Sequence, residues 1–329
     1  MGEATIRDVA KRAAVSVASV SRALNGLANV HPDTRERVLA AARDLGYVPH
    51  AGARSLSLAR THAIGVVLPD LHGEFFSEIV RGLDREASAR GYHLLLSNMH
   101  DGSERAAHAL RTMRGRVDGL VVMAPHIERA ALDAMLPASL PTVTINTPPG
   151  SGRAALRVDN RTGAEAMARH LVATGCRRIV HIGGPPGNID AEERRAGFLA
   201  ALAPDRLAAV LPGDFSEASG EEAVKTLRRE SVPYDAIFAA NDMMALGALQ
   251  ALRADGVEVP AQVAVAGFDD VPLARFLALT TIRVHMDEIG GRAAIRLIDT
   301  LEGRPAGEAA ELVIPELVVR ATTRTELVA

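Results

Sequence analysis

Hydroxyl, amide and guanidinium side chains lie among small apolar ones in "TIRDVAKRAAVSVASVSRALNG", residues 5–26. An arginine can donate two hydrogen bonds to the edge of guanine, and the methyl groups of valine and alanine can contact the methyl of thymine. Hydroxyl and amide groups bind the phosphates that fix the register of a protein on a duplex. The residues of this segment that carry such groups are Thr5, Ser16, Val17, Ala18, Ser19, Ser21, Arg22 and Asn25. Their chemistry suits the recognition of DNA.

Three short helical patterns would position these residues. Thr5 is suited to cap a first helix and Ser16 a second, and Pro32 suits the first turn of a third helix that stops at Gly46. A helix, a tight turn and a second helix within about twenty residues form a helix-turn-helix, whose second helix enters the major groove. On spacing alone the alternative is a three-helix bundle for protein contacts, with the serines as caps or solvated positions.

The distribution of charge also favours a polyanion as the partner of the N-terminal part. The chain of 329 residues has a formal net charge of -3. Residues 1–60 nevertheless hold nine Lys or Arg against five Asp or Glu, whereas the remaining residues hold 28 against 35. A local positive excess on a short segment is typical of a nucleic-acid-binding module.

From Ala63 onward, apolar runs alternate with amphipathic segments of helix length. The runs are AIGVVLP, HLLLSN, GLVVMAP, TVTIN, RIVHIGG, DAIFAAND and VAVAGFDD. Strands that are apolar throughout and alternate with helices predict parallel sheets covered on both faces. We expect two lobes, residues 64–146 and 179–269, which bind a small molecule at the carboxyl ends of their strands. The fold class is α/β, with a three-helix headpiece in front of a two-lobed core.

Other classes of function find no support in the residues. The single cysteine, Cys176, cannot form an intrachain disulfide and fits a small residue that enters a strand. "GGPPG" at residues 183–187 lacks the spacing of a phosphate-binding loop, and the eleven histidines show no zinc-binding pair. The sequence also shows no nucleophile elbow, signal peptide or long apolar run. We therefore expect a cytoplasmic protein without catalytic activity, cofactor, metal site or membrane span.

The segments "TIRDVAKRAAVSVASVSRALNG" and "VHPDTRERVLAAARDLGYVPHAGARSL" resemble the N-terminal module of the lactose repressor and galactose repressor family of bacterial transcription regulators. The similarity continues through IGVVLPD, VDGLVVMAP, ERRAGF, FAANDMMALGAL, VAVAGFDD and TTIRV, so it covers nearly the whole chain. It implies a DNA-binding headpiece at residues 1–47, a hinge at 48–61 and a core at 62–329 similar to periplasmic sugar-binding proteins. The core would cross between its lobes near residues 157–162, 280–287 and 311–320.

The resemblance assigns roles to individual residues of the headpiece and hinge. Val17, Ala18 and Arg22 match the base-reading positions of the family. Leu56, two residues after Arg54 in "ARSL", matches the leucine that wedges into the minor groove at the centre of a palindromic operator, and Arg54 is expected to bind DNA as well. Such a wedge costs base unstacking but lets a bent duplex contact more protein.

Two residues depart from the family pattern. Ala14 replaces the usual glycine of the turn, and His31 replaces the serine that commonly caps the third helix. A left-handed backbone at Ala14 would cost free energy that glycine avoids, and the third helix would keep only Pro32 as a start signal.

The resemblance also places effector contacts at the ends of the core strands. These residues are Asp70, Phe75, Phe76, Asn146, Arg194, Phe215, Asn241 and Asp269. Arg194 and Asp269 can each bind adjacent hydroxyl groups, and an aromatic ring can stack on a sugar ring, so the set favours a sugar or polyol. The phenylalanines could instead belong to the core, and Asn241 could simply cap the helix that follows it.

The sequence thus predicts a homodimeric, DNA-binding transcription regulator, a repressor whose operator affinity is switched by a sugar or sugar derivative. A tetramer is the alternative assembly, and a purine or nucleoside is the alternative effector. Val284 and Met286 stand near positions that often carry polar or aromatic ligand contacts in sugar-binding relatives, so the identity of the ligand stays open. The alternative from another class is a solute-binding receptor with no role on DNA.

Overall fold

The computed structural model describes residues 4–27, 29–48, 60–71, 73–99, 102–148, 153–305 and 310–324. The chain divides into two compact units. One comprises residues 1–63 with 115–118, and the other comprises residues 64–114 with 119–329.

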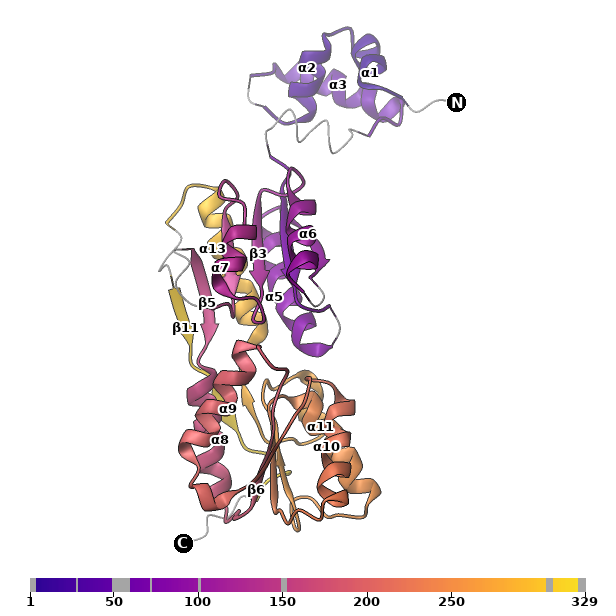
Figure 1. Ribbon diagram of the computed structural model, residues 1–329. Helices are drawn as coiled ribbons and strands as arrows, with labels where there is room; N and C mark the ends of the chain where they lie inside the picture. The colour runs from indigo at the N-terminus through magenta and orange to yellow at the C-terminus, as the bar shows by residue number, and fades with distance from the viewer. Residues whose placement is uncertain are drawn as a thin grey trace. The chain divides into compact units, whose positions relative to one another are not determined.

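The first unit contains three helices around a small core of its own. They are α1 (Ile6–Ala13), α2 (Val17–Leu24) and α3 (Pro32–Asp44), labelled in Figure 1. The buried residues are Val9, Ala10, Ala13, Val20, Ala23, Val38, Ala41 and Ala42. Because alanine and valine dominate this core, the helices pack closely, and the three helices expected from the sequence are confirmed.

The second unit begins with a six-stranded sheet in the order β11-β5-β4-β3-β1-β2. Its strands are β1 (Ala63–Leu68), β2 (His93–Asn98), β3 (Gly119–Met123), β4 (Thr142–Ile145), β5 (Ala154–Val158) and β11 (Ala310–Val313). The pairs β1 with β3, β3 with β4, β4 with β5 and β5 with β11 are parallel. The flanking helices are α5 (Glu74–Ala89), α6 (Ser103–Met113), α7 (Arg129–Met135) and α13 (Met286–Leu301). This sheet and its helices form the first lobe.

A second parallel sheet, in the order β7-β6-β8-β9, forms the second lobe. Its strands are β6 (Ile179–Ile182), β7 (Leu207–Leu211), β8 (Ala236–Ala239) and β9 (Ala264–Ala266). Its helices are α8 (Asn160–Ala173), α9 (Ile189–Ala201), α10 (Glu217–Arg229), α11 (Asp242–Ala254) and the short α12 (Pro272–Phe276), with a 3-10 turn at Pro204–Arg206. Figure 1 shows α8 and α9 on one face of this sheet and α10 and α11 on the other. The α/β class with helices on both faces is confirmed.

Three segments join the two lobes. β5 leads through Asp159 into α8, and β10 (Thr281–Arg283) leads through residues 284–285 into α13. β11 leads through residues 314–315 into β12 (Glu316–Val318), which pairs antiparallel with β10. The polar residues that follow the core strands, such as Asn146 after β4 and Asp269 after β9, therefore lie near these connections.

The seven apolar runs of the sequence all correspond to strands, but β7 was not among them. Leu207–Leu211 is a half-buried edge strand that follows the 3-10 turn. β5 was predicted only as a crossing segment, yet Ala154–Val158 pairs with both β4 and β11 before the chain crosses. β7, LAAVL, is apolar throughout, but its alanines are uncommon in strands, and β5, AALRV, is interrupted by Arg157.

Glycines allow the helices of the second lobe to pack at very short distances. A Cβ atom at Gly247 in α11 would lie 1.9 Å from the backbone oxygen of Glu217 in α10. A Cβ atom at Gly220 in α10 would lie 2.0 Å from the backbone oxygen of Met244 in α11. No side chain fits at such distances, so this helix pair depends on glycine at both positions.

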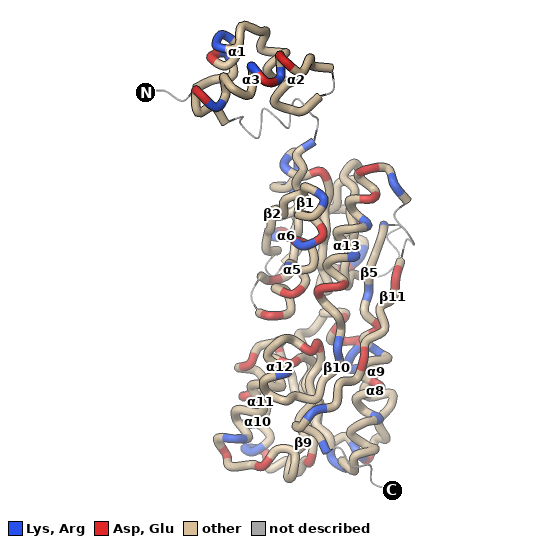
Figure 2. The backbone as a smooth tube through the Cα atoms, turned by 180° about the vertical axis from the view of Figure 1, so that it is seen from behind, with Lys and Arg blue, Asp and Glu red and all other residues tan. Residues whose placement is uncertain are grey.

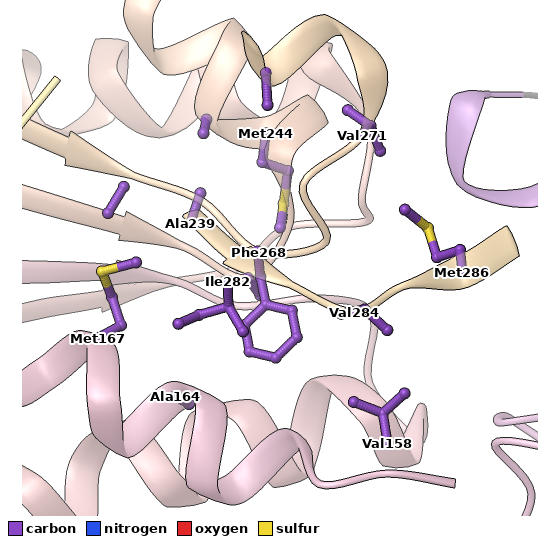
Figure 3. Packing of buried hydrophobic residues seen from close by; sticks show 14 of the residues in the cluster. Val158, Ala164, Met167, Ala239, Met244, Phe268, Val271, Ile282, Val284 and Met286 are labelled. Carbon is purple, nitrogen blue, oxygen red and sulfur yellow. The ribbon is translucent and has the colours of Figure 1, made fainter. Parts of the chain in front are cut away.

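Apolar side chains from the connecting segments complete the core of the second lobe. Figure 3 shows Phe268 and Ile282 pointing toward the helix that carries Ala164, which is α8. A Cβ atom at Gly163 would lie 3.0 Å from both Phe268 and Ile282, so the two side chains rest on the backbone of α8. The strand that reaches the inter-lobe connection is thus anchored in the apolar core.

A histidine lies in the centre of this core. His181 in β6 is fully buried, it stacks on both Phe198 and Phe238, and its Nδ1 is 3.0 Å from the backbone oxygen of Phe238. Burial lowers the pKa of His181 to about 4, from an ordinary value of 6.5. Because the unfolded chain takes up a proton below pH 6.5 and the folded chain only near pH 4, this residue reduces stability as the pH falls between these values.

We expect His181→Gln to remove about 3 kcal/mol of the stability loss between pH 6.5 and pH 4, at about 1.36 kcal/mol per pH unit. Urea unfolding at several pH values measures this change. His93→Gln, at an exposed histidine of β2, is the matched control. An equal pH dependence in wild type and both variants would contradict the prediction.

Candidate functional site

The exposed face of α2 carries the residues predicted to read bases. Val17, Ala18 and Arg22 are all exposed, while Val20 and Ala23 on the other face are buried in the headpiece core. Ala18 and Arg22 are four residues apart and therefore share one face of the helix. The structure brings these three side chains onto one accessible surface.

The hydroxyl groups predicted to bind phosphate also start the helices. The Thr5 hydroxyl accepts from the Asp8 amide, and the Asp8 carboxylate accepts from the Thr5 amide at 2.9 Å, which forms a capping box. The Ser16 hydroxyl accepts from the Ser19 amide at 3.1 Å. Both caps are at exposed positions. The same hydroxyls are thus held at the helix N-termini, where backbone N–H groups favour an anion.

Two further polar residues of the predicted DNA set lie along α2. Ser21 and Asn25 are partly buried, and the Asn25 amide donates to the Ser21 hydroxyl at 3.4 Å. Arg54 and Leu56, the predicted hinge contacts, lie outside the described residues.

Both departures from the family pattern have the expected local effect. Ala14 has a φ of 52°, the left-handed conformation that costs a residue with a Cβ roughly 1 kcal/mol. His31 makes no capping hydrogen bond through its side chain, and Pro32 occupies the first helical position of α3. The turn and the start of α3 keep their geometry without the usual glycine and serine.

In the core, a buried polar network lies where the two lobes meet. We call Asn146, Asn160, Asp190, Arg194 and Asp269 the inter-lobe network. Each of these residues exposes less than a tenth of its surface. Asn146 follows β4 of the first lobe, and the other four belong to the second lobe. Figure 2 shows acidic and basic residues close together at the level of β10 and α9.

Arg194 is the centre of this network. Its Nη2 is 2.9 Å from Oδ1 of Asp269, its Nε donates to Asn160 at 2.9 Å, and its Nη1 donates to the backbone oxygen of Ala240 at 2.6 Å. The guanidinium carbon lies 3.9 Å from the centre of the Phe268 ring, a cation–π contact. Partners on four sides fix the orientation of this arginine.

Asp190 joins the network to the first lobe. Its carboxylate accepts from the Asn146 side chain at 3.2 Å and from the Asn160 side chain at 2.8 Å. The Asn146 oxygen in turn accepts from the Val158 amide at 3.0 Å. Asn146 has a φ of 43°, a left-handed conformation that asparagine tolerates better than most residues. The end of β4 is therefore bent to bring this amide against α9.

Burial changes the acidity of both carboxylates in the network. It raises the pKa of Asp190 to about 6, and Arg194 opposes this rise. It raises the pKa of Asp269 to about 7, although Arg194 lies against that carboxylate. Asp242 at the start of α11 is also buried, and its pKa lies well above the ordinary value for the same reason. Buried carboxylates of this kind gain from hydrogen-bond donors or cations that reach them.

Two other predicted effector residues lie beside the network. Asn241 caps α11, because its side-chain oxygen accepts from the Met244 amide at 2.9 Å, and its side-chain nitrogen donates to the backbone oxygen of Phe215 at 3.0 Å. Phe215 has a φ of 71°, and its ring centre is 6.0 Å from the Arg194 guanidinium. Asn241 therefore has the capping role that was considered from the sequence. Its side-chain nitrogen also holds the backbone of Phe215, whose ring lies near Arg194.

The remaining three predicted effector residues are on the first lobe, outside the inter-lobe network as defined. The Asp70 carboxylate accepts from the Leu71 amide at 2.7 Å and from the Asn98 side chain at 3.4 Å. Phe75 and Phe76 form an edge-to-face pair, with ring centres 5.2 Å apart, at the start of α5. Both rings are partly buried and pack against the core, so the core role considered from the sequence is present.

Three further contacts connect the lobes. The Ile189 amide of α9 donates to the backbone oxygen of Pro125 at 2.9 Å, and the Leu273 amide of α12 donates to the Glu74 carboxylate of α5 at 2.8 Å. Arg157 of β5 forms an ion pair with Glu193 of α9 at 2.5 Å. The structure therefore describes the lobes in contact with each other.

Sequence reasoning missed Asp190 and Asn160 as members of this site. Asp190 stands four residues before Arg194, and residues at this spacing share one face of a helix. This spacing was the available signal for Asp190, because Arg194 was already a candidate. Asn160 had no comparable signal, since it reaches Arg194 and Asp190 only after α8 and α9 have packed together.

Within the part of the chain that the structure describes, no helix is long and apolar enough to cross a membrane. The same described residues contain no group of three or more His, Cys, Asp or Glu placed to hold a metal ion.

Two protein-family models match this chain. Residues 5–50 match the model described as bacterial regulatory proteins, lacI family, and residues 168–323 match a periplasmic binding protein-like domain. The first match covers α1 to α3. The second covers the second lobe from the C-terminal part of α8 onward, together with β10, α13, β11 and β12.

Proteins of known function and solved structure are similar over almost the whole length. The ribose operon repressor of Halalkalibacterium halodurans is 32% identical over 324 residues, 97% of each chain. The HTH-type transcriptional repressor PurR of Haemophilus influenzae is 32% identical over 336 residues, 98% of this chain and 100% of the relative. A crystal structure of the lac repressor dimer bound to operator and the anti-inducer ONPF has a TM-score of 0.88 at 29% identity, covering 98% of this chain and 99% of that one.

Proposed function

Because the chain belongs to the lacI family of bacterial regulatory proteins, we propose that it represses transcription at a palindromic operator and that a small molecule bound between its lobes controls this repression. It is a DNA-binding regulator rather than an enzyme. The observation that carries the proposal is the joint exposure of Val17, Ala18 and Arg22 on α2 of the headpiece.

We propose that α2 enters the major groove. Arg22 then donates to a guanine, and the methyl groups of Val17 and Ala18 contact thymine methyls. Thr5, Ser16 and Ser19 are placed at or near helix N-termini, where they suit phosphate contacts. The headpiece would comprise residues 1–47, with a hinge at 48–61 and the core at 62–329.

The hinge would supply the second part of DNA recognition. We propose that Leu56 inserts into the minor groove at the centre of the operator and that Arg54 contacts DNA beside it. Partial unstacking of a base step costs a few kcal/mol, which the additional contacts to bent DNA would offset.

We propose a sugar or sugar derivative as the effector, bound by Arg194, Asp269, Asn146, Asn241 and Phe215 with help from the first-lobe residues Asp70, Phe75 and Phe76. The inter-lobe network supports this assignment, because buried carboxylates, amides and a guanidinium suit several hydroxyl groups at once. The similar ribose operon repressor favours a sugar. The similar PurR favours the second candidate, a purine or nucleoside.

Control of DNA binding would follow from thermodynamic linkage. A ligand that prefers one arrangement of the two lobes shifts the population of the chain toward that arrangement, and the affinity for DNA changes by the same coupling free energy. We infer a homodimer, since one headpiece reads only a half-site and palindromic operators match a two-fold axis, with a tetramer as the alternative. We also infer action in the bacterial cytoplasm, at the nucleoid when DNA is bound.

Electrophoretic mobility shift with a palindromic operator fragment tests the proposal. We expect salt-sensitive binding, because neutralisation of phosphates releases counterions. The absence of DNA binding at any ligand condition would support the remaining alternative, a solute-binding receptor with no role on DNA.

Arg22→Ala should relax the preference at one base pair of each half-site by about 1 to 3 kcal/mol, because it removes the proposed bidentate contact to guanine. Mobility shifts on operators with single base changes measure this preference. Arg43→Ala, at an exposed position in the last turn of α3, is the control and should leave base preference unchanged. An equal loss on all operator sequences would make Arg22 a phosphate contact instead.

A further inference from the structure

Asp190 is a buried carboxylate at the meeting point of the two lobes. It lies in the first turn of α9, one turn before Arg194, and exposes 6% of its surface. One of its oxygens accepts from Asn146 of the first lobe at 3.2 Å, and the other accepts from Asn160 at 2.8 Å. One oxygen thus faces Asn146, which is proposed to hold the effector, and the other faces Asn160, which also contacts Arg194.

The charged residues around Asp190 form ion pairs with other partners. The Arg194 guanidinium lies 2.9 Å from Asp269 and directs its Nε to Asn160. Glu193, three residues after Asp190 on α9, is paired with Arg157. The two hydrogen-bond partners of Asp190 are neutral amides. The one guanidinium of the inter-lobe network, that of Arg194, acts on both Asp190 and Asp269, so the network holds two carboxylates and one guanidinium.

The excess of negative charge in the inter-lobe network would act on any ligand bound there. Interactions between charges are stronger in a buried site than in water, so a carboxylate or phosphate on the ligand would be repelled by Asp190. Hydroxyl and ammonium groups would instead donate to it, and hydrogen bonds to an ionised acceptor are the stronger kind.

We propose that Asp190 is a specificity-determining residue of the effector site, which selects a neutral or cationic polyhydroxylated ligand and rejects its carboxylated or phosphorylated analogue. This inference rests on the proposed function, because it requires that the inter-lobe network binds the effector. It adds the charge class of that effector, and it assigns the selection to one side chain.

A panel of sugars that differ in charge provides the test. Calorimetric titration of the full chain at pH 7.5 compares D-ribose with D-ribose 5-phosphate, and D-galactose with D-galactosamine and D-galacturonate. Asp190 is ionised at this pH, since its pKa is raised only to about 6. We expect the neutral or cationic member of a pair to bind at least about tenfold more tightly than the anionic one, a difference of about 1.4 kcal/mol.

Substitution of Asp190 assigns the effect to that residue. Asp190→Asn removes the charge at nearly constant volume, and Asp190→Ser removes it with a smaller group that can both donate and accept. Each should reduce the preference against the anionic sugar to within about threefold, which is about 0.65 kcal/mol. Asp205→Asn, at an exposed aspartate after α9, is the matched control and should keep the wild-type preference.

The possible results separate this inference from the proposed function. Binding of an anionic sugar as tightly as its neutral parent would overturn the inference and leave a sugar effector in place. An unchanged preference in both Asp190 variants would also overturn it, since Asp190 would then be only a structural link between the lobes. If no sugar in the panel binds, the sugar class and the inference fail together.

Discussion

Replacement of Arg194 by alanine should destabilise the core by about 3 to 5 kcal/mol, the usual cost of removing one partner from a buried ion pair. The substitution leaves the Asp269 carboxylate in a buried site without its cation and removes donors to Asn160 and to the Ala240 carbonyl. It also removes the stacking on Phe268. Urea unfolding of the core at pH 7.5 measures the effect.

Arg195→Ala is the matched control for this prediction. Arg195 is the next residue on α9 and has an exposed side chain, so its loss should change stability by no more than about 0.5 kcal/mol. Equal stability of the two variants would mean that Arg194 is not held as the structure shows. Arg194→Ala should also lose the response of DNA binding to the effector, whereas Arg195→Ala should retain it.

Gly247→Ala should destabilise the second lobe by about 3 kcal/mol, toward the upper end of the range for overpacked sites. The new methyl group would lie 1.9 Å from the backbone oxygen of Glu217, so α10 and α11 would have to separate. This loss would exceed the roughly 1 kcal/mol that alanine gains over glycine in a helix. The midpoint of urea unfolding, followed by circular dichroism, measures the net change.

Gly291→Ala in α13 distinguishes packing from helix propensity. A Cβ atom there would lie 3.2 Å from the end of the Arg85 side chain and 3.3 Å from Glu86, flexible groups that can move aside. This control should therefore be neutral or more stable by up to about 1 kcal/mol. A stabilised Gly247→Ala variant would show that the close approach of α10 and α11 is not required.

The apolar and capping patterns were sufficient to predict most of the fold. Thr5, Ser16 and Pro32 start the three headpiece helices as expected, because caps act within one turn and need no tertiary contact. Seven strands were predicted from their apolar runs, and β2 among them is a largely exposed edge strand. β7 was missed although residues 207–211, LAAVL, are all apolar, since its alanines are residues that are uncommon in strands.

The candidate effector site was predicted less completely. Asn146, Arg194 and Asp269 were expected as separate ligand contacts, and the structure joins them through Asp190 and Asn160, which were not expected. Asn241 proved to be a helix cap as well as a neighbour of Phe215. Apart from the local Asn241 cap, which was considered from the sequence, each of these contacts joins residues that are far apart in the sequence, so no local pattern records them.

By itself, the sequence determined the helix-turn-helix headpiece, the α/β class of the core and the chemical types of the residues at strand ends. These properties depend on propensity, capping and apolar periodicity, which act over a few neighbouring residues. Only the tertiary structure decided that Arg194 pairs with Asp269 while Asp190 is held by two amides. That choice depends on how α8, α9 and the end of β4 pack, since burial and distance set the strength of each charge interaction.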